Sequence, residues 1–85
     1  MTQDEFALFR PIADEIFANA GVSAERNPSR YVECLHILRT RMEELDSAVR
    51  KEKCSLQERN LLWVKQQFDL TQHLQSLMFE GHVLP

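Results

Sequence analysis

The chain has 85 residues, of which 44% are hydrophobic and 27% charged, with only two glycines and three prolines. This length suits a single helical domain over residues 1–85 and excludes a second one, and the scarcity of turn residues favours few, long elements. The net charge of −3 at pH 7 is mild, and the bases between residues 26 and 53 are interleaved with acids, which argues against a nucleic-acid-binding regulator.

The amino-terminal residues 1–5 include two acids, and no apolar run follows that is long enough for a signal peptide. No later segment approaches the ~20 apolar residues of a membrane span. We therefore expect a cytoplasmic protein with no membrane partner. Cys34 and Cys54 should lie about 30 Å apart along a helix that rises ~1.5 Å per residue, so we expect two free thiols in a reducing compartment.

The first predicted helix covers residues 3–20. Thr2 and Glu5 have the spacing of a capping box, and Gly21 is a natural stop. Its apolar positions cover about half of the helix circumference; they are Phe6, Phe9, Ile12, Ala13, Ile16, Phe17 and Ala20. Because proline removes a backbone hydrogen bond and clashes with the preceding turn, Pro11 predicts a kink or a break near residues 9–10.

The second predicted helix covers residues 28–53 and carries one narrow apolar seam. Asn27 is a preferred capping residue, and Pro28 suits the first helical position. Apolar residues then recur at steps of four and three; they are Tyr31, Leu35, Leu38, Met42, Leu45 and Val49. A seam of this kind needs a helical partner of similar length.

The third predicted helix covers residues 56–80, since Ser55 and Glu58 repeat the capping-box spacing and Gly81 supplies a stop. The short turn at residues 53–55 makes the second and third helices an antiparallel hairpin. Folding the chain there places large apolar residues opposite one another. We predict one continuous buried seam, made of Tyr31, Leu35, Leu38, Leu45, Trp63, Leu70, Leu74 and Leu77.

The third helix has more apolar surface than one neighbour requires. A second row consists of Leu61, Val64, Phe68 and Met78. We expect this row to contact the first helix, which gives an all-α three-helix bundle. Uncharged polar residues lie between the two rows, at Asn60, Gln67, Thr71 and Gln75. They are either solvated edge amides or polar groups that give an interface its specificity.

The sequence contains no phosphate-binding glycine loop, nucleophile elbow, zinc cluster or calcium loop. His36 and His73 come near each other in the hairpin, but both project away from the apolar seams, so we interpret them as surface histidines. We expect no enzyme, and therefore no catalytic residue, cofactor, metal or small-molecule substrate.

Two function classes remain. The first is a small protein-interaction module that binds and masks or regulates another protein, as a secretion chaperone, an anti-activator or a phage-encoded inhibitor does. The alternative is a self-assembling structural homodimer. Large apolar groups and amides left over from the core are the predicted partner-binding residues; they are Leu8, Ile12, Leu62, Gln67, Thr71, Gln75, Phe79, Val83 and Leu84. Alternatively, the tail after Gly81 folds back and covers these groups.

Overall fold

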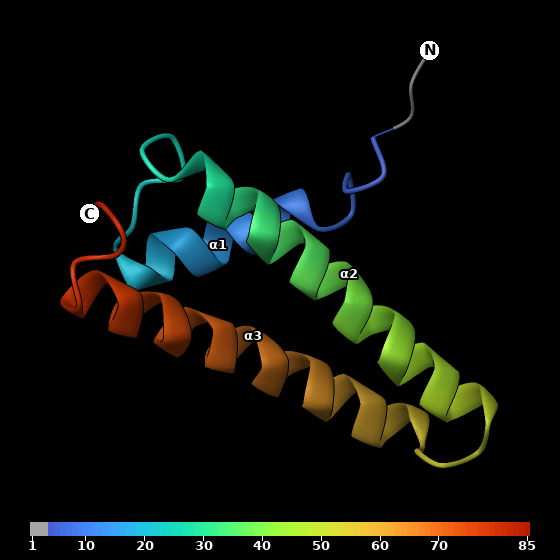
Figure 1. The fold of residues 1–85 in the computed structure, drawn as a ribbon. Helices are drawn as coiled ribbons and strands as arrows, with labels where there is room; N and C mark the ends of the chain where they lie inside the picture. Colours follow the sequence, from blue (N-terminus) through green and yellow to red (C-terminus); the bar gives the residue numbers. More distant parts are fainter. Residues whose placement is uncertain (1–3) are drawn as a thin grey trace.

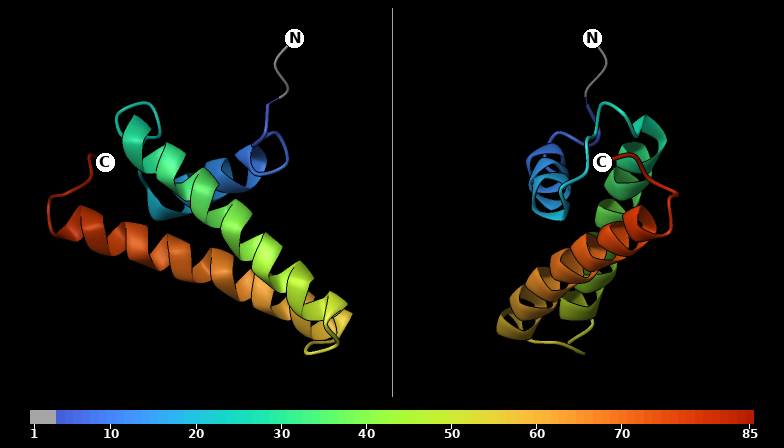
Figure 2. Two further views of the ribbon diagram at one scale, coloured as in Figure 1. Left: turned by 45° about the vertical axis from the view of Figure 1, so that its right-hand side comes forward. Right: turned by 90° about the vertical axis from the view of Figure 1, so that its left-hand side faces the viewer.

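The computed structural model describes residues 4–85, and their three helices are α1 (Arg10–Ala20), α2 (Pro28–Arg50) and α3 (Leu56–Phe79) (Figure 1). The predicted all-α three-helix bundle is confirmed, because all three helices pack against one another. Helices α2 and α3 meet at the turn over residues 51–55 and diverge toward their other ends. Figure 2 shows that α1 lies at the open end of this hairpin.

Helix α1 begins at Arg10, so the predicted start at residue 3 is wrong. Pro11 lies in the first turn of the helix, where its missing N–H needs no partner. Of the two predicted effects of Pro11, a kink or a break near residues 9–10, the structure shows the break, because the helix begins at Arg10. The proposed cap Thr2 lies outside the described residues. Residues 4–9 form turns instead, in which the Arg10 N–H donates to the carbonyl of Phe6 at 3.0 Å.

The turns before α1 are held on α2 by Phe6. Its ring packs edge to face on His36, with 4.8 Å between the ring centroids, and the Arg39 guanidinium lies 5.3 Å from the Phe6 centroid. Arg39 also forms an ion pair with Glu5 at 3.1 Å. The His36 ring is thus in contact with the segment that precedes α1.

The three helices end in the same way. The residue after the last turn has a positive φ, and the next N–H donates to the carbonyl five residues earlier, which is a Schellman motif. The residues with positive φ are Gly21 at 73°, Glu52 at 58° and Gly81 at 81°. Because Glu52 ends α2, the helix stops at Arg50 and not at the predicted residue 53.

Asn27 precedes α2 but does not cap it through its side chain, contrary to the prediction. Its amide nitrogen donates to the carbonyls of Ser23 at 2.7 Å and Leu84 at 2.6 Å. Its amide oxygen accepts the Leu84 N–H at 2.8 Å. The buried Asn27 therefore ties the carboxyl-terminal tail to the connector between α1 and α2.

Helix α3 begins at the predicted Leu56 and ends at Phe79, one residue before the predicted end. The Ser55 hydroxyl accepts the Glu58 N–H at 3.1 Å, and Gly81 follows the helix with the expected positive φ. An ion pair of 3.0 Å between Arg59 and Asp46 links the arms of the hairpin near the turn.

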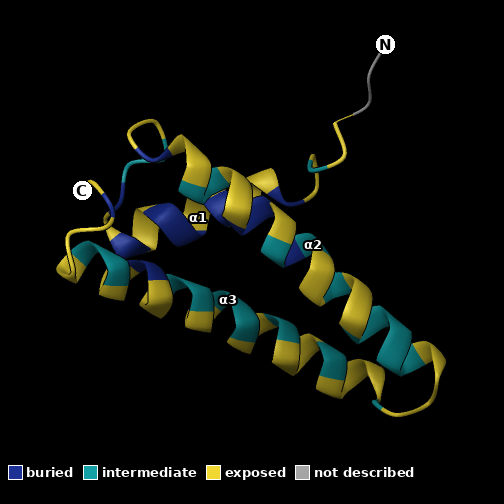
Figure 3. Ribbon diagram, in the orientation of Figure 1, coloured by how far each residue is buried: buried dark blue, intermediate teal, exposed yellow. Residues whose placement is uncertain are grey.

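The core lies at the open end of the hairpin, around α1 (Figure 3). Its buried hydrophobic residues are Phe9, Ala13, Ile16, Phe17, Ala20, Val22, Cys34, Leu35, Leu38, Leu74 and Val83. The predicted continuous seam is only partly correct, because Leu35, Leu38 and Leu74 are buried whereas its other five residues are half-buried. Near the turn only two helices meet, so no third layer excludes water there.

Candidate protein-binding surface

The amino-terminal half of α3 carries an exposed apolar row on its outer face. Leu61, Val64 and Phe68 lie within about 60° of one another on a helix that turns 100° per residue. They are 73%, 64% and 61% exposed. These three residues, called here the α3 row, form one continuous apolar strip over two helical turns.

The α3 row is uncovered because α1 and α2 pack on the opposite face of α3. The core-facing residues Trp63, Leu70 and Leu74 lie about 115–155° from the centre of the row on the helical wheel. Figure 3 shows the exposed side of α3 turned away from the other two helices. The expected contact of this row with the first helix is therefore wrong, and only Met78 of the predicted set packs against the core.

The two edges of the α3 row differ in chemistry. Glu58 and Lys65 lie along one edge, seven residues apart, and both are exposed. Asn60 and Gln67 lie along the other edge with the same spacing. Among the described residues neither Glu58 nor Lys65 has an ion-pair partner. Both charges thus face solvent beside an apolar strip.

The structure distributes the predicted partner-binding residues over several regions. The exposed ones are Leu8, Leu62, Gln75, Phe79 and Leu84, and the half-buried ones are Ile12, Gln67 and Thr71. Val83 is buried in the core, which removes it from any binding surface. The tail thus folds back as the alternative interpretation described, although Leu84 and Phe79 stay exposed, Phe79 by 93%.

These predicted residues do not form one patch. Leu8 precedes α1, Phe79 ends α3 at the far side of the molecule, and Leu62 is only 40% exposed (Figure 1). The Thr71 hydroxyl donates to the carbonyl of Gln67 at 2.9 Å within its own helix. Of the uncharged polar residues of α3, Asn60 and Gln67 border the α3 row, while Thr71 and Gln75 lie beyond its end.

Sequence reasoning assigned the α3 row to the core. A signal against this assignment was present in Pro11, because a proline is favoured in the first turn of a helix and predicts a short first helix. A helix of 11 residues spans only ~16 Å, whereas the 24 residues of α3 span ~36 Å. The first helix could not cover a row along most of the third.

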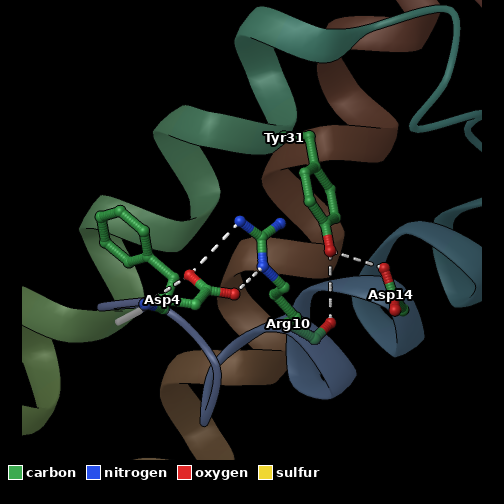
Figure 4. A network of polar contacts seen from close by, with 5 residues as sticks. Asp4, Arg10, Asp14 and Tyr31 are labelled. Carbon is green, nitrogen blue, oxygen red and sulfur yellow. Dashed lines mark hydrogen bonds and ion pairs between the residues drawn. The ribbon is translucent and has the colours of Figure 1, made fainter. Parts of the chain in front are cut away.

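A polar network joins α1 to α2 (Figure 4). The Tyr31 hydroxyl donates to the Asp14 carboxylate at 2.7 Å, and Arg10 forms an ion pair with Asp4. The hydrogen bond from Arg10 lowers the pKa of Asp4, while burial and the Asp14 carboxylate raise the pKa of Tyr31. These contacts hold the start of α1 in place.

The buried thiol of Cys34 is poorly suited to nucleophilic chemistry. Burial, with a smaller effect from Glu33, raises its pKa to about 11, so that the thiol is protonated at neutral pH. A small, partly open pocket lies beside it between the helices, lined mainly by apolar side chains.

Within residues 4–85, no three His, Cys, Asp or Glu side chains are grouped closely enough to hold a metal ion. None of the three helices is both long and apolar enough to cross a membrane. The chain matches no protein-family model, no curated protein and no solved structure.

Proposed function

We propose that this protein is a non-enzymatic helical interaction module that binds another polypeptide through the α3 row and thereby masks or regulates it. The observation that carries the proposal is the exposure of Leu61, Val64 and Phe68 as one continuous strip. Contiguous apolar surface on a small chain marks an interaction site more often than isolated apolar residues do. Binding in the cytoplasm would suit the free thiols of Cys34 and Cys54.

The shape of the surface favours a helix as the bound element. The α3 row lies on a convex helix face, and the ridges of a second helix pack between side chains that are spaced in this way. Burying each of the three side chains contributes about 1.5–3 kcal/mol. The free-energy cost of association is of comparable size to the sum of these three contributions. We therefore propose a contact of moderate affinity, suited to reversible regulation.

The test is a capture experiment with two matched triple variants. In the first, serine replaces Leu61, Val64 and Phe68; in the second, it replaces Leu8, Leu56 and Phe79, which are equally exposed apolar residues outside the row. Proteins retained by the wild-type chain from a lysate of its source cells are identified, purified and titrated against all three forms by calorimetry. Both variants should fold normally because the substituted side chains are exposed.

The row variant should weaken binding of the purified partner by roughly tenfold or more, whereas the control variant should bind as the wild type does. Equal binding by the row variant, or a loss confined to the control variant, would refute the assignment of the α3 row. Catalytic turnover of a captured small molecule would refute the non-enzymatic role.

A further inference from the structure

We infer that the helix that fits the α3 row is the α3 row of a second copy of this chain, paired antiparallel about a two-fold axis. This inference rests on the proposed function, since it names the occupant of the same surface. Apolar, charged and amide groups follow one another along the exposed turns of α3 in an order that suits such a pair.

The apolar strip is complementary to itself. In an antiparallel pair, Leu61 of one copy packs against Val64 of the second, and the symmetry repeats this contact. Phe68 then lies over the aliphatic part of Gln57 at each end of the contact. Such alternating layers are the usual packing of antiparallel helices, and all the side chains they need are exposed.

The charges favour the antiparallel orientation over the parallel one. Glu58 and Lys65 lie on the same edge, two turns and ~10 Å apart. An antiparallel two-fold brings Glu58 of each copy beside Lys65 of the other, which gives two attractive pairs. A parallel two-fold pair would instead place the charged edge of each copy beside the amide edge of the other, so neither attractive pair would form.

The amide edge is compatible with the same arrangement. Asn60 and Gln67 lie opposite each other across the axis, and each side chain has both donor and acceptor groups. The Asn60 amide oxygen already accepts the Arg59 guanidinium at 3.1 Å, which leaves its amide nitrogen to donate. Helices α1 and α2 lie on the other side of α3, so no described helix stands between the two copies (Figure 2).

The contact is short, since three apolar residues per copy cannot reach the ~800 Å² per partner of a standard interface. We therefore expect a weak dimer that forms between about 10 µM and 1 mM. The test is sedimentation equilibrium of the full chain over this range. It compares the wild type with Glu58→Lys, Lys65→Glu, their equimolar mixture and the double variant.

Each single variant replaces two attractive pairs by two repulsive ones and should weaken dimerisation by roughly five- to tenfold. The mixture restores both attractive pairs, because one variant has lysine at both positions of the charged edge and the other has glutamate at both. It should dimerise as the wild type does, and so should the double variant, in which the two charges are exchanged. Circular dichroism verifies that Glu58→Lys, in the first turn of α3, stays helical.

Leu61→Asp provides a second test that does not involve the cap of α3, and it should abolish the dimer without changing the fold. A wild type that stays monomeric to 1 mM would overturn the inference, and a dimer equally tolerant of all the charge variants would overturn the antiparallel register. Either result leaves the proposed function standing if a captured protein still requires the α3 row.

Discussion

At the scale of single residues, Asn27 connects parts of the chain that are far apart in sequence. Its amide group makes hydrogen bonds with Ser23 and with both backbone groups of Leu84. An asparagine before a proline is an ordinary helix-start signal, so its true role could not be deduced from the sequence. The role depends on where the tail returns, which is a tertiary property.

Replacing Asn27 with Ala should lower the free energy of unfolding by about 1–3 kcal/mol, because it removes three partly buried hydrogen bonds that hold the tail. Urea denaturation measures the change. Asn19→Ala is the control, since Asn19 is exposed on α1, and it should change stability by less than about 0.5 kcal/mol. Equal effects of both substitutions would show that the tail is not held by Asn27.

The two cysteines should differ in reactivity. At pH 8 the Cys34 thiol, with a pKa of about 11, should resist iodoacetamide, whereas the half-buried Cys54 should be alkylated. Burial raises the pKa of Cys34 in the folded state above the ordinary 9.0, so the thiol loses its proton less readily in the folded state than in the unfolded state. Stability should therefore fall as the pH rises from 9.0 toward 11, and Cys34→Ala should reduce this decline, leaving the part above pH 10 that comes from the raised pKa of Tyr31. Rapid alkylation of folded Cys34, measured by mass spectrometry, would contradict its burial.

At the scale of elements, the capping signals predicted α3 well but not the start of α1. Ser55 gave the correct start of α3, and Gly81 gave its end to within one residue. The start of α1 was missed because the spacing of Thr2 and Glu5 was preferred to Pro11, whose place in the first turn decides the start. The end of α2 was missed because a glutamate in the left-handed region carries no sequence signature.

Glu52→Gly should raise the free energy of unfolding by about 0.5–1 kcal/mol. Glycine adopts the φ of 58° without the Cβ strain, and this gain is partly offset by the greater conformational freedom of glycine in the unfolded chain. Gly81→Ala is the reciprocal control. A Cβ at Gly81 meets no atom within 4 Å, so its loss of about 1 kcal/mol would report backbone strain alone. Thermal unfolding measures the change in stability of both variants. If Glu52→Gly is less stable than the wild type, the Glu52 side chain must make a favourable contact that outweighs its backbone strain.

At the scale of the whole molecule, the periodicity of apolar residues predicted three helices, their antiparallel pairing and the bundle. It could not predict that the hairpin opens. The predicted pairing assumed that α2 and α3 are in contact along their full length. In the structure α1 packs against both helices at the open end of the hairpin, and most of the buried residues lie around it. The α3 row was therefore assigned to the core although it faces solvent.

Truncation of the seam should reveal this uneven burial. Leu38→Ala, at a fully buried position beside α1, should cost about 2–5 kcal/mol of unfolding free energy. Leu45→Ala, on the same helix but half-buried near the turn, should cost less than half as much. Denaturant titration of the two variants gives the comparison, and equal losses would restore the uniformly packed hairpin that the sequence predicted.

The open hairpin also implies a gradient of local stability along the two long helices. The last turns of α2 and the first turns of α3 have few buried neighbours, so their amide protons should exchange with solvent through local fraying, while those beside α1 exchange only on global unfolding. The α3 row lies mostly on the fraying half. A chain bound there would suppress the fraying, and part of the binding free energy would be used to order this half of the molecule.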